Sequence, residues 1–127
     1  MSANPNFASI VSFATIRLSV ANASLLGTGT GVVLLIAPVG GTKITRVRIK
    51  ARGPTTAGMI RFFASDGTII SPMTEVPVVA VTPSATVESW SGEATGLAGL
   101  ALPNGAQIFV TTERAELFHV WAELANF

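Results

Sequence analysis

The chain has 127 residues, of which 49% are hydrophobic and only 12% are charged, half of the ~25% charged share that is usual in globular domains. This composition excludes a disordered polyelectrolyte and indicates one folded domain, and the absence of cysteine excludes disulfides and thiolate metal sites. A domain of this size cannot bury all of so apolar a sequence, so we expect exposed apolar surface and self-association.

The net charge of +1 hides a division of charge along the chain. Residues 1–65 contain seven basic residues and no acidic one, whereas residues 66–127 contain seven acidic residues and one basic residue, Arg114. Such segregation favours pairing of the two halves, either within one sandwich or between protomers. The alternative is that the charges simply intermix in three dimensions.

The polar N-terminal residues predict a mobile arm over residues 1–6, followed by one domain over residues 7–127. The arm has neither the basic nor the apolar segment of a secretion signal. The most apolar run, residues 32–37, is far shorter than the ~20 residues needed to cross a bilayer. We therefore expect a protein made in the cytoplasm that does not contact a membrane.

The first half of the domain is rich in β-branched residues, which predict one or two strands over residues 7–20 and a buried strand over residues 32–37. Gly27, Gly29 and Gly31 lack the spacing of a nucleotide-binding loop. Glycines at a strand entry indicate instead a bulge or a close backbone approach.

The clearest strand pattern covers residues 43–52. Basic and apolar residues alternate from residue 46 onward, and a period of two places them on opposite faces of a strand. The apolar face, with Val47, Ile49 and Ala51, belongs in a core. The basic face supplies the candidate partner-binding residues, which are Lys43, Arg46, Arg48, Lys50 and Arg52.

Three functions are open to this basic face. It could bind nucleic acid, but the chain is nearly neutral and no aromatic residue interleaves with the cations to stack on bases. It could be a solvated face that pairs with Glu on a neighbouring strand. We favour the third function, contact with an acidic protein surface, because the planar guanidinium pairs well with carboxylates. No direct contact with nucleic acid is expected.

Residues 59–64 predict a strand in which Phe62 and Phe63 face opposite sides. The Asp-Gly dipeptide at 66–67 predicts a hairpin with a primed turn, and the return strand then covers residues 69–75.

Prolines at positions 72, 77 and 83 predict an edge strand or an extended loop, because proline cannot donate to a ladder. A further strand is predicted over residues 85–91, followed by an irregular segment over 92–99. The Asn-Gly dipeptide at 104–105 predicts another hairpin, with residues 107–112 as its return strand.

Residues 113–125 fit two patterns. Phe118, Val120 and Leu124 alternate with polar residues as in a strand, whereas Ala115, Phe118 and Ala122 also fit helical spacing. The strand is favoured because the preceding chain is all-β and a last strand can close a sheet. The sequence thus predicts about eight short strands, arranged as an antiparallel β-sandwich of jelly-roll type.

The sequence contains no motif that indicates catalysis. His119 is the only histidine and has no predicted partner for general-base chemistry, and no carboxylates have the spacing of a metal site. We therefore predict that the protein is not an enzyme and uses no cofactor and no metal.

Several short segments resemble, in matching order, small structural proteins encoded by tailed phages and prophages. The segments are Thr-Gly-Thr at 28–30, Arg-Val-Arg-Ile-Lys-Ala at 46–51, Thr-Thr-Ala-Gly-Met-Ile-Arg at 55–61, Ser-Asp-Gly at 65–67, Val-Thr-Pro-Ser-Ala-Thr-Val at 81–87 and Leu-Pro-Asn-Gly at 102–105. The resemblance covers most of residues 25–127 and supplies no functional residues position by position.

The resemblance implies a capsid decoration, or cement, protein with a jelly-roll fold. Such a protein would bind the major capsid protein and copies of itself, as a homodimer or homotrimer on the capsid surface of the virion, after synthesis in the host cytoplasm. The alternative is a tail or tail-fibre module that binds a receptor or a carbohydrate.

Overall fold

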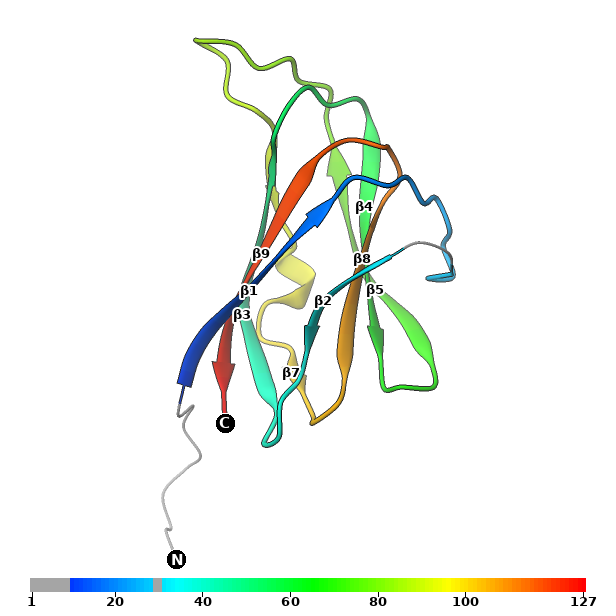
Figure 1. Cartoon of the computed structure of the whole chain (residues 1–127), viewed down its shortest axis with the longest axis vertical. Coiled ribbons are helices and arrows are strands. Elements are labelled where there is room, and N and C mark those ends of the chain that lie inside the picture. The colour runs from blue at the N-terminus through cyan, green and yellow to red at the C-terminus, as the bar shows by residue number, and fades with distance from the viewer. Residues whose placement is uncertain (1–9, 29–30) are drawn as a thin grey trace, which may run out of the picture.

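Two antiparallel sheets pack face to face in the computed structural model, which describes residues 10–28 and 31–127 (Figure 1). The predicted arm at 1–6 lies outside the described residues. The first sheet, here named the β1 sheet, contains β1 (Ile10–Leu18), β9 (Phe118–Asn126), β3 (Thr42–Ala51) and β6 (Ser91–Glu93) in that order, and β7 (Ala101–Leu102) also pairs with β3. The second, the β2 sheet, contains β2 (Val32–Ile36), β8 (Gln107–Thr112), β4 (Gly58–Ser65) and β5 (Ile70–Val78).

The strand pairs are nested along the chain. β1 pairs with β9, β2 with β8, β3 with β6 and β4 with β5, and every pair is antiparallel. A long hairpin that is rolled up gives this nesting, which defines a jelly roll. The predicted antiparallel β-sandwich of jelly-roll type is therefore confirmed. The described residues form nine strands, close to the number of about eight that was expected.

The ambiguous C-terminal segment forms a strand. β9 lies between β1 and β3, and its period-two side chains alternate between core and surface, so the favoured strand interpretation is correct. Within the described part of the chain, the only helical element is the short 3₁₀ turn η1 (Thr95–Leu97).

The core lies between the two sheets and is built from the apolar parity of each strand. On β3 the predicted core residues Val47, Ile49 and Ala51 are 0%, 1% and 3% exposed. On β9 the fully buried Phe118 meets the edge of Trp90, with ring centroids 5.8 Å apart and ring planes at 85°.

A β-bulge in β3 explains why the alternation begins only at Arg46. The register with β9 shifts between Ile44 and Arg46, so Thr45 is an extra residue that is exposed beside Arg46. Ile44 is fully buried on the core side of the bulge, and Lys43 returns to the exposed face that carries Arg46.

The strand predicted over residues 59–64 is present in the β2 sheet as β4. Phe62 lies in the core, and Phe63 is also buried although it lies outside the core cluster. Gly27 covers Phe63: a Cβ at Gly27 would lie 3.3 Å from the Phe63 ring, which is the close backbone approach expected of a glycine in this segment. β5, which contains Pro72 and Pro77, is an edge strand as expected.

Two turn predictions need correction. The hairpin between β4 and β5 forms, but its loop has a positive φ only at Gly67, and not also at Asp66 as a type I′ turn requires. The Asn-Gly turn at 104–105 does not form a hairpin, because β7 and β8 belong to different sheets. Ala106 donates its N–H to the carbonyl oxygen of Pro103 at 3.1 Å, and this turn takes the chain from one sheet to the other.

The strand predicted over residues 85–91 is also wrong. Ser84 holds a local turn, in which its hydroxyl oxygen accepts hydrogen bonds from the N–H groups of Thr86 and Val87 at 3.2 and 3.1 Å. A side chain that bonds the nearby backbone competes with ladder formation. Pairing with β3 begins only at Ser91, the last residue of the predicted strand, and continues to Glu93 in the segment that was expected to be irregular.

Candidate functional site

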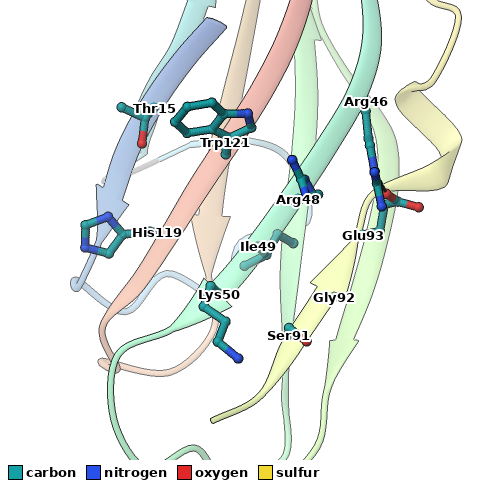
Figure 2. A pocket seen from close by; sticks show the side chains of 10 residues that line it. All are labelled: Thr15, Arg46, Arg48, Ile49, Lys50, Ser91, Gly92, Glu93, His119 and Trp121. Atoms are coloured by element: carbon teal, nitrogen blue, oxygen red, sulfur yellow. Dashed lines mark hydrogen bonds and ion pairs between the residues drawn. The ribbon is translucent and has the colours of Figure 1, made fainter. Parts of the chain in front are cut away.

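The outer face of the β1 sheet carries an open hollow of about 850 Å³, shown in Figure 2. Its walls come from β1, β9, β3 and β6, and its lining residues are Thr15, Arg46, Arg48, Ile49, Lys50, Ser91, Gly92, Glu93, His119 and Trp121. Its size lies within the range of ~300–1,000 Å³ that is typical of small-molecule sites.

Strand register places the lining side chains in rows that run across the sheet. In one row, Thr15 of β1 lies opposite Trp121 of β9, Trp121 lies opposite Arg48 of β3, and Arg48 lies opposite Glu93 of β6.

The neighbouring row runs through Arg17, His119, Lys50 and Ser91 in the same strand order. Residues that lie opposite each other share a face of the sheet. The two rows therefore bring together side chains that are more than 100 positions apart in the sequence.

An aromatic pair forms the apolar end of this face. Phe13 and Trp121 stack with ring centroids 4.3 Å apart and ring planes only 8° from parallel. Both rings are solvent-accessible, since Phe13 is 58% exposed and Trp121 is 37% exposed. Aromatic side chains this exposed on the face of a sheet are typical of contact surfaces.

The basic face of β3 is paired with glutamates of the same chain. Arg48 Nη2 donates to Glu123 Oε2 at 2.8 Å, and Arg46 pairs with Glu93. Lys50 Nζ donates to Glu88 Oε1 at 2.7 Å. In these contacts, basic residues of the first half of the chain pair with acidic residues of the second half within one sandwich. This is one of the two arrangements expected from the segregation of charge.

Two pKa shifts follow from these pairs. The hydrogen bond and charge of Lys50 lower the pKa of Glu88, and the hydrogen bond and charge of Glu93 raise the pKa of Arg46. Both pairs are solvent-exposed, so their contribution to stability is small and is screened by salt.

All five predicted partner-binding residues lie on or next to this outer face, and each is exposed. Lys43, Arg46, Arg48 and Lys50 belong to β3, and Arg52 directly follows it. Arg52 Nη1 donates to His119 Nε2 at 3.2 Å, since a guanidinium has only donors. The face is thus a mosaic of cations and glutamates and not a bare row of cations.

The sequence reading did not assign Phe13, Trp121 or Glu93 to the candidate site. The alternation in β9 does carry a signal, because the residues between its buried positions, His119, Trp121 and Glu123, must face outward. The alternation does not predict the register between β9 and β3, which places Trp121 beside Arg48.

This surface can stack on an apolar ring face and can donate and accept hydrogen bonds. Among the residues that the structure describes, no three His, Asp or Glu side chains come together in a way that could hold a metal ion. No helix long and apolar enough to cross a membrane occurs within residues 10–28 and 31–127.

Comparison of the chain with models of known protein families and with curated proteins found no match.

Proposed function

We propose that this protein is a structural component of a tailed-phage particle, a decoration protein that binds the major capsid protein and further copies of itself on the capsid surface. The observation that carries the proposal is the outer face of the β1 sheet, where an exposed aromatic stack adjoins a mosaic of paired charges. The sequence resemblance supplies the kind of assembly.

The chemistry of this face suits a protein contact. Interface cores are enriched in aromatic residues and Arg, and their rims are polar. Phe13 and Trp121 would form the anchor, and the charged residues of β3 would form the rim. A mosaic of both signs favours specificity for one partner, because a partner in the wrong position meets like charges.

Other exposed apolar residues offer contacts to further neighbours. Leu26, Val39 and Ile69 are 76%, 83% and 64% exposed, and they lie in loops that do not belong to the β1 sheet. A protein that joins neighbouring subunits of a shell needs more than one such surface. A rigid sandwich keeps these surfaces at fixed separations.

The test is binding to particles that lack the protein. Purified protein is added to such capsids, which are then pelleted, and the bound protein is quantified by mass spectrometry and located by cryo-electron microscopy. The wild type is expected to pellet with the capsids at a regular site. Its absence from every particle would overturn the proposal.

Neutralising both partners separates the partner contact from the internal ion pair. Arg48→Gln alone leaves Glu123 without its partner, whereas Arg48→Gln with Glu123→Gln removes both charges and sets no like charges opposite each other. If the partner recognises these charges, the double variant should fold normally but bind to the capsids more weakly than the wild type. Full binding by the folded double variant would show that these two charges serve only the internal ion pair.

A second function is favoured by the hollow itself. Trp121 stands in it beside Thr15 and Arg48, an arrangement in which a sugar ring could stack while its hydroxyls form hydrogen bonds (Figure 2). The cations are already neutralised by glutamates, so an uncharged, polyhydroxylated ligand fits better than an anion. This would make the protein a tail or tail-fibre module that binds a carbohydrate receptor.

Saccharide binding is tested on a glycan array with the wild type and Trp121→Ala. Specific binding that the variant loses would favour the receptor function, whereas no binding by the wild type would remove it.

A further inference from the structure

The four outer edges of the two sheets differ in how well they are protected from pairing with another chain. In the β2 sheet, β5 contains Pro72 and Pro77, and β2 has only five residues with a register shift. In the β1 sheet, the edge strand β6 has only three residues. Proline, shortness and bulges are the devices by which proteins blunt sheet edges.

β1 has none of these devices. It has nine residues without proline, and its ladder with β9 runs from Ile10 to Leu18 without a register shift. Within the described part of the chain, β1 pairs only with β9, so its other edge has no ladder partner. A long, regular edge strand with unpaired N–H and C=O groups is a template for strand addition.

The exposed large apolar residues of β1 lie in its N-terminal half. Ile10, Val11 and Phe13 are 60%, 86% and 58% exposed, and the strand's one charged residue, Arg17, lies near the other end. In Figure 1 the N-terminal end of β1 diverges from β2. The C-terminal end instead lines a small hollow together with Val32. The open part of the edge is therefore residues 10–16.

We infer that residues 10–16 of β1 pair antiparallel with the same residues of a second copy of this chain, joining two β1 sheets into one continuous sheet about a twofold axis. The inference deepens the proposed assembly role and rests on its self-association. A twofold contact is self-complementary, which a strand pairing with its own copy satisfies directly.

The register that uses residues 10–16 is centred on Phe13. Val11 then lies opposite Thr15 of the second copy, and the two Phe13 side chains lie side by side on the outer face. Because each Phe13 already stacks on Trp121, the pairing joins two stacks into a row of four rings. Aromatic pairs across strands stabilise such ladders.

The charges of β1 permit this register. Arg17 is the only charged residue of the strand, and pairing about Phe13 places the two Arg17 side chains at opposite ends of the ladder. Like charges directly opposite each other would destabilise a ladder, and here none meet. A second copy is therefore a compatible occupant of the edge.

The first test compares two valines with almost the same exposure. Val11 on β1 is 86% exposed, and Val39 in the turn before β3 is 83% exposed. Sedimentation equilibrium of the wild type should give the mass of a dimer. Val11→Lys places a cation diagonal to Arg17 of the second copy, so its dimer dissociation constant should rise at least tenfold. Val39→Lys should dimerise as the wild type does.

The second test locates the twofold axis. The chain has no cysteine, so Phe13→Cys introduces the only thiol, directly opposite its own copy. Opposite residues of an antiparallel pair have Cα atoms ~4.5–5.5 Å apart, within the range of a disulfide. Mild oxidation should convert Phe13→Cys into a covalent dimer, whereas Val39→Cys should remain largely uncrosslinked.

Three results would overturn the inference: a monomeric wild type at tens of micromolar, a dimer that Val11→Lys and Val39→Lys affect equally, or equal crosslinking of the two cysteine variants. Particle binding by a protein that stays monomeric would overturn only the strand pairing. A β1-paired dimer that never joins a particle would overturn only the proposed function.

Discussion

Arg48 bonds to Glu123 at 2.8 Å, although the residue opposite Arg48 on β9 is Trp121. Arg46, which does lie opposite Glu123, pairs instead with Glu93 on β6. The two arginines thus reach diagonally to opposite sides of β3, so that β3 is tied to both of its neighbours. Diagonal neighbours in a sheet are ~7–8 Å apart at Cα, which long side chains can span.

The coupling energy of these diagonal ion pairs can be measured with double-mutant cycles. Replacing Arg48 and Glu123 by Ala, singly and together, should give a coupling of about 0.2–1 kcal/mol in urea unfolding, since both side chains are partly exposed. The coupling should fall in 1 M salt, where the Debye length is about 3 Å. The matched cycle between Arg46 and Glu123, which lie opposite each other, should give a smaller coupling. A larger coupling for that pair would contradict the diagonal assignment.

The basic face of β3 could be predicted from the sequence because a period of two fixes which side of a strand each residue occupies. The burial of Ile49 and the exposure of Arg48 follow from that rule alone. The neighbours of Arg48 could not be predicted, because the register between β3 and β9 joins residues more than 65 positions apart.

The errors in the turns have a related cause. Asn104 and Gly105 form a turn, but whether a turn makes a hairpin depends on the sheet that the next strand joins, and β8 joins the β2 sheet. Trp90 suggested a strand by its type, whereas the Ser84 turn before it delays pairing until Ser91. Local propensity identifies the elements better than it identifies their partners.

The centre of the core should be sensitive to the loss of Phe118. This fully buried ring packs edge-on against Trp90, so Phe118→Ala leaves a cavity that the sheets cannot close. We expect a loss of about 3–5 kcal/mol in the free energy of unfolding. Ile49→Val, which removes one methylene at a site that is 1% exposed, should cost about 0.5–1.5 kcal/mol. Equal losses would show that the core is loosely packed.

The loop between β4 and β5 should contribute an acid-sensitive part of the stability. The Asp66 carboxylate accepts hydrogen bonds from the N–H groups of Ile69 and Thr68, and these bonds lower its pKa. A lowered pKa means that the unfolded chain binds more protons. The contribution is therefore complete above the ordinary Asp pKa of about 3.9 and is lost as the pH falls through the folded value.

Asp66→Asn keeps an acceptor oxygen but removes the titrating group. Unfolding measured from pH 6 to pH 2 should show a steeper fall below about pH 4 for the wild type than for this variant. Glu88→Gln should reduce the slope in the same sense, because Lys50 lowers the pKa of Glu88. Parallel curves for Asp66→Asn and the wild type would exclude a role for the Asp66 carboxylate.

Gly41 and Gly67 share a positive φ, of 86° and 100°, but differ in what surrounds them. A Cβ at Gly67 would meet nothing within 4 Å, so Gly67→Ala should cost about 1–2 kcal/mol for the left-handed backbone alone. A Cβ at Gly41 would lie 2.7 Å from the carbonyl oxygen of Leu102 on β7. Gly41→Ala should therefore add about 1–3 kcal/mol of steric strain and weaken the pairing of β7 with β3. Urea unfolding of the two variants measures the difference, and equal costs would mean that β7 moves aside freely.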